Sequence, residues 1–281
     1  YLRIFMKEVF TQLRHAELVS ASNPYTHVGK ILRQAQDDRK KGFTLAEVLI
    51  TLTIIGVIAA LTIPNLIASY QKQQYVTQLK KVYTEISQAM KQVMADEGIN
   101  KLTLSDTLYC DYENGCDLDE ALQRVGNDFL KKYFKVIKDC GTEYPSPCFA
   151  SKYNTINGNE GSVIPSGYSV INVGGASISI FPTQKQYSGT IYVDINGLNP
   201  PNIYGRDLFT MAFFYDGSID EFGINPQCRK GEISVNGLGW LCNGKGNAYE
   251  ARESMFEEYC DHQGYGSCFG KILNDNWKMD Y

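Results

Sequence analysis

The sequence predicts an α+β protein in which one long N-terminal helix packs on an antiparallel sheet, in a region tied together by disulfides. Three observations predict this class. A long apolar run passes directly into an amphipathic helical pattern, short β-branched runs separated by Gly and Asn follow later, and all eight cysteines lie beyond the helical pattern. The helix therefore comes first in the chain, and the sheet follows it.

Residues 43–67 form the apolar first half of the predicted helix, FTLAEVLITLTIIGVIAALTIPNLI. About 20 apolar residues are enough to cross the hydrocarbon core of a bilayer, so this segment predicts a membrane-spanning helix. A secretory signal peptide explains the segment less well, because its apolar core is too long and no small-x-small cleavage site follows it. We therefore expect the segment to stay in the protein as an anchor.

Basic residues orient this span. The first 42 residues hold eight Lys or Arg and four Asp or Glu, and Lys40 and Lys41 stand directly before the apolar run. Positive flanks remain in the cytoplasm. We therefore expect a single-pass membrane protein with a cytoplasmic N-terminus and an exported C-terminal body. The chain begins with Tyr1, and we expect the residues before about Lys30 to be a fragment, translated upstream sequence or the result of a misplaced start.

One acidic residue, Glu47, interrupts the apolar run. An unpaired carboxylate at the bilayer centre costs roughly 2.5–3.5 kcal/mol, so an intramembrane acid usually marks a function and a partner. A simple membrane anchor has no use for one. Glu47 is therefore the first candidate for a functional residue.

The residues around Glu47 carry a resemblance to a known family. Two lysines, then Gly42, Phe43, Thr-Leu-Ala, Glu47 and the apolar run resemble the processing and methylation motif of type IV pilins and type II secretion pseudopilins; Gly56 in mid-helix and Pro64 near the membrane exit also match. The resemblance implies that a prepilin peptidase removes residues 1–42 as a leader, cutting after Gly42, and methylates Phe43.

The resemblance also implies a role for Glu47. Cleavage leaves a positive amine on Phe43, and the family pattern pairs the acid of an incoming subunit with the amine of a neighbour. Burying either charge alone costs several kcal/mol, so pairing them sets the stagger between subunits. The implied partners are other pilin or pseudopilin subunits, the prepilin peptidase, the membrane and an inner-membrane assembly platform.

Residues 68–97 continue the helix in amphipathic form. Apolar residues recur at intervals of three and four from Tyr75 to Met94, while lysines, glutamines and Glu85 fall elsewhere, so this half should pack one face on a globular head. Gly98 ends the pattern. Residues 43–97 together predict a single helix about 80 Å long, kinked or locally loosened at Pro64.

Residues 98–281 predict one globular head. A second helical pattern begins after a capping Asp117 and runs from Leu118 to Ile137. Alternating or β-branched runs then predict a hairpin and further strands in an antiparallel meander, with turns at Gly174-Gly175 and Asp216-Gly217. The expected strands cover residues 168–173, 176–181, 190–195, 208–215 and 218–222.

An even number of cysteines, all on the exported side, predicts disulfides in an oxidising compartment. Sequential pairing would close four short loops, although eight cysteines allow 105 connectivities. Zinc is the weaker explanation, because there is no Cys-x-x-Cys pair and only His262 follows the leader. The candidate disulfide residues are Cys110, Cys116, Cys140, Cys148, Cys228, Cys242, Cys260 and Cys268.

The run from Val193 to Phe209, VDINGLNPPNIYGRDLF, resembles a segment of many cysteine-rich pseudopilin-like proteins. Asp194, Asn196 and Asp207 are hard oxygen donors near a tight turn, which is the chemistry of a calcium site. The same Asp-x-Asn-Gly pattern also serves a plain turn, in which the side chains bond to the local backbone. We keep both interpretations open, and calcium is the candidate cofactor.

Composition excludes some function classes. The chain has 27 Lys and Arg, of which 19 lie beyond residue 42, and 31 Asp and Glu, of which 27 lie beyond it. The exported body therefore has a net charge of −8. Such a body repels phosphate backbones, so nucleic acid is disfavoured as a partner. No nucleophile elbow, Walker loop or zinc-protease motif is present, so we expect no enzyme.

The favoured function is a structural subunit of a type II secretion or type IV pilus-like filament, a minor pseudopilin. The alternative is a pilus-displayed adhesin with a Tyr-rich head.

Overall fold

The computed structural model describes residues 43–161, 165–183, 189–229, 242, 245–262 and 266–281. The chain divides into two compact units, Tyr1–Ala60 and Leu61–Tyr281. In the first unit, the described residues belong almost entirely to the start of helix α2. The second unit holds the rest of this helix, the sheet and the C-terminal helices.

Helix α2 spans Leu45–Asp96 without interruption at Pro64. Its 52 residues correspond to about 78 Å at 1.5 Å per residue. The helix ends where Gly98 takes a φ of +66° and the Ile99 amide donates to the Met94 carbonyl at 3.0 Å, which is a glycine-dependent C-terminal cap. The prediction of one long helix ending near Gly98 is confirmed.

In the described part of the chain, six antiparallel strands follow as a meander in the order β1-β2-β3-β4-β5-β6. The expected hairpin at Gly174-Gly175 joins β2 to β3, and the turn at Asp216-Gly217 joins β5 to β6. The predicted meander is confirmed, with β6 shorter than expected. The strands are β1 Val136–Gly141, β2 Tyr168–Asn172, β3 Ser177–Phe181, β4 Gly189–Asp194, β5 Leu208–Phe213 and β6 Ile219–Asp220.

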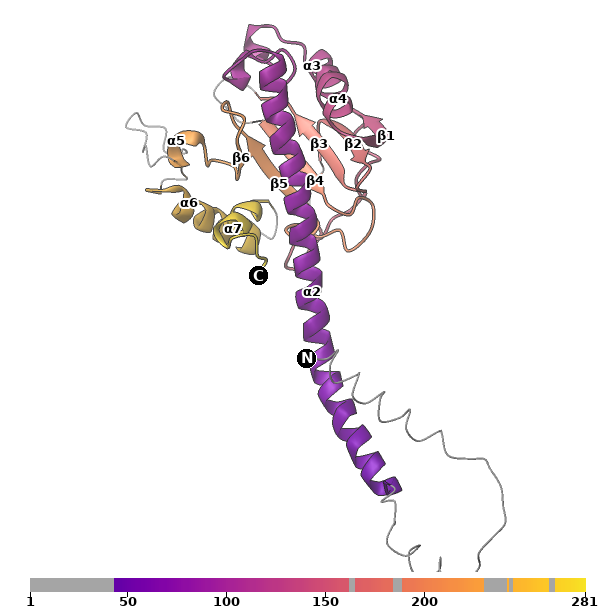
Figure 1. Ribbon diagram of the computed structural model, residues 1–281. Coiled ribbons are helices and arrows are strands. Elements are labelled where there is room, and N and C mark those ends of the chain that lie inside the picture. Colours follow the sequence, from indigo (N-terminus) through magenta and orange to yellow (C-terminus); the bar gives the residue numbers. More distant parts are fainter. Residues whose placement is uncertain (1–42, 162–164, 184–188, 230–241, 243–244, 263–265) are drawn as a thin grey trace, which may run out of the picture. The chain divides into compact units, whose positions relative to one another are not determined.

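The main core lies between α2 and one face of the sheet (Figure 1). The strand register aligns Val170, Ile178, Val193 and Phe209 in one apolar row across β2 to β5. Alternate residues of a strand face the same side, so such rows present a continuous apolar face to the helix. The helix supplies seven buried residues to it: Val76, Leu79, Val82, Ile86, Ala89, Met90 and Val93.

The opposite face of the sheet is covered by loops. Tyr153 and Tyr204 pack there with their ring centroids 5.8 Å apart, beside the Cys140–Cys148 disulfide. Polar strand residues on this side find partners; the Ser169 hydroxyl, for example, donates to the Ser179 hydroxyl at 3.0 Å. Both faces of the sheet are therefore buried, as the head's size permits.

The region from Leu118 to Ile137 differs from the prediction. Asp117 does cap a helix, but α3 Leu118–Arg124 gives way to a π-helical turn, Val125–Leu130, and a last short turn, α4 Lys131–Tyr133. The prediction of a helix through Ile137 was wrong, because that residue lies in β1. Pairing with β2 outweighs the apolar periodicity of this stretch. Close packing also shapes the π turn: a Cβ on Gly126 would lie 2.3 Å from the Tyr168 ring.

The C-terminal part is helical, which the sequence reasoning did not predict. Its described elements are α5 Pro226–Arg229, α6 Ala248–Met255, a π-helical turn Phe256–His262 and α7 Phe269–Asn274. Contacts at β6 anchor α6 and α7. Arg252 Nε donates to Asp220 Oδ1 at 2.9 Å, and the Gly270 amide donates to the buried Glu221 at 2.9 Å. Asp220 at the end of β6 therefore binds α6, and Glu221, the next residue, binds α7.

The helix-to-sheet core predicts a large effect for Ile86→Ala. Ile86 is fully buried between α2 and the sheet, so its truncation should lower the free energy of unfolding by about 2–5 kcal/mol. The control, Lys91→Ala, changes an exposed residue of the same helix and should stay within about 0.5 kcal/mol. Urea unfolding followed by near-ultraviolet circular dichroism measures both. Equal effects of the two substitutions would contradict this placement of the core.

Candidate functional site

Glu47 lies in the first turn of α2 and bonds back to Thr44. Its Oε2 accepts hydrogen bonds from the Thr44 amide and the Thr44 hydroxyl, each at 2.8 Å, and the Glu47 amide donates to Thr44 Oγ1 at 3.2 Å. This reciprocal arrangement is a capping box, which satisfies helix amides that have no partner within the helix. The Thr-x-x-Glu pattern was visible in the sequence, and our reasoning missed it. Glu47 therefore has a local structural partner as well as its predicted role.

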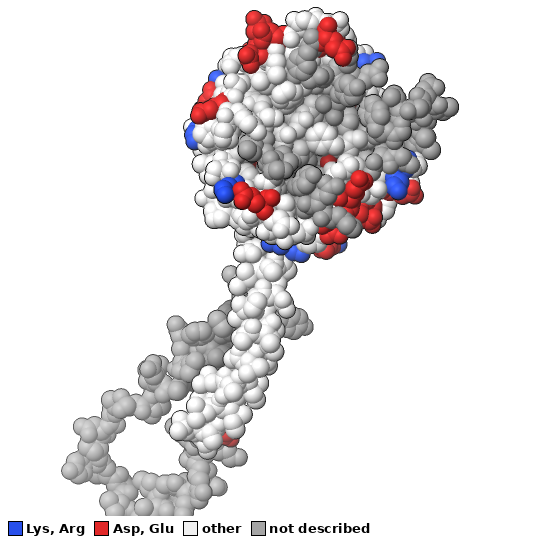
Figure 2. All heavy atoms as spheres, turned by 180° about the vertical axis from the view of Figure 1, so that it is seen from behind, with Lys and Arg blue, Asp and Glu red and all other residues white. Residues whose placement is uncertain are grey.

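The helix surface around Glu47 is apolar and exposed. Every residue from Phe43 to Ile58 is exposed, and the side chains of Phe43 and Leu45 are 80% and 77% exposed. Among the described residues, α2 is the one helix long and apolar enough to cross a membrane. Figure 2 shows charged side chains spread over the head and almost none on the apolar part of α2. This surface needs lipid or other protein to cover it.

The other predicted features of the N-terminal segment are placed as follows. Gly42, the leader of residues 1–42, and Lys40 and Lys41 lie outside the described residues. Gly56 lies within α2, and a Cβ there would meet no atom within 4 Å. The glycine is therefore not required by packing inside this chain. Pro64 also lies within the continuous helix.

The eight candidate cysteines form four disulfides in the sequential pairing. The bonds are Cys110–Cys116, Cys140–Cys148, Cys228–Cys242 and Cys260–Cys268, with Cα–Cα distances of 5.4, 5.9, 5.3 and 5.1 Å. Each bridge closes a short loop within the head. The Cys140–Cys148 bridge, for example, joins the end of β1 to the loop that follows it.

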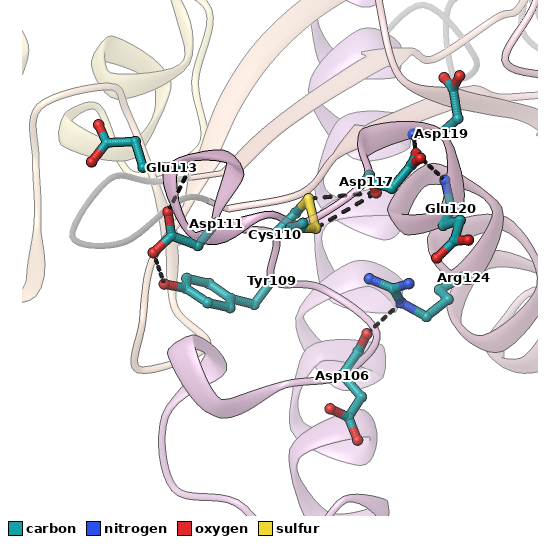
Figure 3. Close-up of a disulfide and its surroundings, with 10 residues drawn as sticks. Asp106, Tyr109, Cys110, Asp111, Glu113, Asp117, Asp119, Glu120 and Arg124 are labelled. Carbon is teal, nitrogen blue, oxygen red and sulfur yellow. Dashed lines mark hydrogen bonds between the residues drawn. A yellow bond between two sulfur atoms is a disulfide. The ribbon is translucent and has the colours of Figure 1, made fainter.

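The first disulfide lies in an acidic loop between α2 and α3 (Figure 3). Asp117 Oδ1 accepts hydrogen bonds from the amides of Asp119 and Glu120 at 2.8 and 3.1 Å, and so begins α3. Arg124 Nε donates to the Asp106 carbonyl at 2.8 Å, which ties the helix back to the loop. Asp117 therefore caps α3, and Arg124 links α3 to the preceding loop, so both residues have a structural role.

Of the three candidate calcium ligands, Asp194 and Asp207 are engaged with the protein, whereas the buried Asn196 Oδ1 has no hydrogen-bond partner. Asp194 accepts a hydrogen bond from the Tyr153 hydroxyl at 2.6 Å and from the Asn196 amide at 3.1 Å. Asp207 accepts from the amides of Asn202 and Ile203, both at 2.6 Å. Within the described ranges, no group of three or more His, Cys, Asp or Glu could hold a metal ion. The contacts of Asp194 and Asp207 fit a hydrogen-bonded turn, and calcium at this turn stays a prediction.

The turn has the backbone conformations that its sequence suggests. Gly197 has a φ of +67°, and a Cβ there would lie 2.7 Å from the Gly175 carbonyl oxygen. Gly205 has a φ of +75°, and a Cβ there would lie 2.6 Å from Cys268 Sγ. Only glycine accommodates both restrictions. The run from Val193 to Phe209 therefore joins the sheet to the C-terminal disulfide.

Two family models match parts of this chain. Residues 37–63 match the model of the prokaryotic N-terminal methylation motif. The long helix, the antiparallel sheet with disulfides and this motif together define a pilin-like protein with a prepilin-type N-terminus. Residues 65–280 match a family of unknown function, DUF6613, and the chain belongs to that family. No curated protein and no solved structure matches the chain.

Buried carboxyl groups predict that the head loses stability as the pH rises. Burial raises the pKa of Asp194 from 3.8 to about 8, so the folded state keeps a proton that the unfolded state releases. The free energy of unfolding should therefore fall between about pH 4 and pH 8. Burial raises the pKa of Glu221 to about 7, which acts in the same direction.

Urea unfolding across this pH range measures the effect. Asp194→Asn cannot ionise and should flatten the decline, whereas Asp128→Asn, at an exposed position, should leave it as in the unsubstituted protein. An unchanged slope in Asp194→Asn would show that this carboxyl group does not hold a proton in the folded state.

Proposed function

We propose that this chain is a structural subunit, a minor pseudopilin or pilin, of a type II secretion or type IV pilus-like filament. Prepilin peptidase cleaves it after Gly42 and methylates Phe43. The observation that carries the proposal is the acid Glu47 in the first turn of an exposed apolar helix, within the segment that matches the methylation motif. Before assembly, this helix anchors the chain in the inner membrane, with the head exported.

The assembly role of Glu47 follows from charge. In an apolar filament core an isolated carboxylate is costly, and the methylated amine of a neighbouring Phe43 supplies the opposite charge. The hydrogen bonds from Thr44 help to hold the carboxylate while it lacks that partner. The empty space beside Gly56 supports close approach of another helix, since small residues let helix backbones approach one another.

The head supports a role as an exported subunit. Four disulfides require an oxidising compartment, which agrees with translocation of residues 98–281. The amphipathic residues 68–97 join the head to the span. A head of this size favours a minor or tip subunit, because the repeating subunits of such filaments are usually smaller.

The first test is the mature N-terminus. Intact-mass measurement and N-terminal sequencing of the membrane-extracted protein should show a chain that begins at Phe43 and carries one methyl group. A mature protein that keeps the residues before Phe43 would contradict the proposed processing, whatever filament the chain enters.

Substitutions at Glu47 test separately its negative charge and its hydrogen bonds with Thr44, which cap α2. Glu47→Gln removes the charge but keeps an acceptor for Thr44, while Glu47→Ala removes both. We expect both variants to insert and to be cleaved, and both to be lost from sheared filaments on immunoblots. Thr44→Ala, which removes the hydroxyl partner and keeps the charge, is the control and should still enter filaments. Normal assembly of Glu47→Gln beside failure of Glu47→Ala would assign Glu47 to capping alone.

A further inference from the structure

One edge of the head is basic. Strand β1 lies at the end of the described sheet, and residues 131–138, which lead into it, hold four lysines and no acidic residue. We call these residues the basic edge. Lys135 and Lys138 are exposed. Within the described residues, the Lys135 side chain has no hydrogen bond or ion pair, and Lys138 Nζ donates to the neutral Pro147 carbonyl at 2.9 Å. Neither of these charges is therefore neutralised by a close carboxylate of the described chain.

The other two lysines of the basic edge are already paired. Lys131 Nζ lies 2.6 Å from Asp139 Oδ2, and Lys132 Nζ lies 2.6 Å from Asp96 Oδ2. The Ile137 side chain is 65% exposed. The surface that a partner can use therefore consists of the two unpaired lysines and this aliphatic side chain.

The acidic loop between α2 and α3, residues 104–120, has the opposite charge. It holds six Asp or Glu and no Lys or Arg. Asp106, Asp119 and Glu120 are exposed, and their carboxylates have no ion-pair partner in the described ranges (Figure 3). Arg124 lines the same hollow of about 750 Å³ as Asp106 and Glu120, and it offsets one of the six charges. The loop keeps a large excess of negative charge.

Both surfaces lie level with the last turn of α2. On the basic edge, Lys132 Nζ donates to Asp96 Oδ2 at 2.6 Å. In the acidic loop, the Thr107 amide donates to Glu97 Oε1 at 3.2 Å. Asp96 and Glu97 are neighbours in the chain, so the two surfaces are at the same height along the helix.

The two surfaces nevertheless lie at different sides of the head. Just before the acidic loop, the Leu102 amide donates to the Tyr215 carbonyl at 2.7 Å, in the turn between β5 and β6. Strand β6 is at the opposite end of the sheet order from β1 (Figure 1). A contact between two such distinct surfaces is heterologous, and heterologous contacts repeat into rings or open helical filaments.

We propose that the basic edge of one subunit binds the acidic loop of a second copy of this chain beside it in the filament. Lys135 and Lys138 face the carboxylates of the loop. Ile137 and Leu104, which is 63% exposed, supply an apolar contact between the charges. In a body whose net charge beyond residue 42 is −8, this edge gives copies that would otherwise repel one another a point of attraction.

The inference rests on the proposed function and names one neighbour within the filament. Pairing of Glu47 with the amine of a neighbouring Phe43 shifts two subunits by four residues, which is about 6 Å along α2. Heads shifted by so little lie nearly level with each other. The basic edge of one head therefore meets the acidic loop of the next at matching height.

Zero-length cross-linking of sheared filaments tests the contact. A carbodiimide joins a lysine amine to a carboxylate without a spacer, and a denaturing gel isolates the dimer of this chain for peptide mass spectrometry. We expect cross-links from Lys135 or Lys138 to Asp106, Asp119 or Glu120 in that dimer. Filaments that contain the chain but yield no such dimer, or a dimer cross-linked through other surfaces, would overturn the inference and leave the proposed function standing.

Charge reversal measures what the contact contributes to assembly. Lys138→Glu and Glu120→Lys should each lower the amount of the chain in sheared filaments about fivefold, the factor that corresponds to one exposed ion pair at the upper end of its usual strength. The two substitutions in one chain should restore that amount, because every contact between copies then joins opposite charges again.

The matched control is Lys278→Glu, the same charge change at an exposed lysine of the C-terminal tail, beside the Ser69–Thr77 part of α2. It should enter filaments like the unsubstituted chain. Equal effects of Lys138→Glu and Lys278→Glu, or no recovery in the combined variant, would overturn the inference. A chain that is absent from filaments even without substitution would instead overturn the proposed function, and this inference with it.

Discussion

The rest of the structure depends on the packing of α2 against one face of the sheet. Val170, Ile178, Val193 and Phe209 align across four strands, and the helix lays its own apolar stripe on them. Burial of apolar surface supplies most of the stability of such a domain, at roughly 25 cal/mol per Å². The residues that α2 gives to this core lie between Val76 and Val93, whereas residues 43–58 of the chain are exposed.

The other face of the sheet is stabilised by polar contacts as well as by a smaller apolar cluster that includes Tyr153, Tyr204 and Leu208. Asp194 and Asp207 are buried, and protein amides and the Tyr153 hydroxyl satisfy them. Buried polar groups cost little only when they are hydrogen-bonded in this way. Asp194 and Asp207 thus connect loops to the strands, and the Cys140–Cys148 disulfide lies on the same face.

Glu47 illustrates how one residue can satisfy two constraints. Its hydrogen bonds with Thr44 cap α2 within the chain, and a capped carboxylate is already oriented at the start of the helix. The proposed amine partner is created only by cleavage before Phe43. The cap and the proposed ion pair thus act at different stages, because the first needs only the folded helix and the second needs a neighbouring subunit.

The sequence by itself determined the long helix, its end at Gly98, the meander and the place of Glu47, because these follow from local periodicity and turn chemistry. It also supported the sequential disulfide pairing, since short loops bring neighbouring cysteines together. Only the tertiary structure decided that Ile137 belongs to a strand, that Asp220 and Glu221 anchor the C-terminal helices, and that Asp194 bonds to Tyr153. Those outcomes depend on contacts between residues far apart in the chain, which no local pattern encodes.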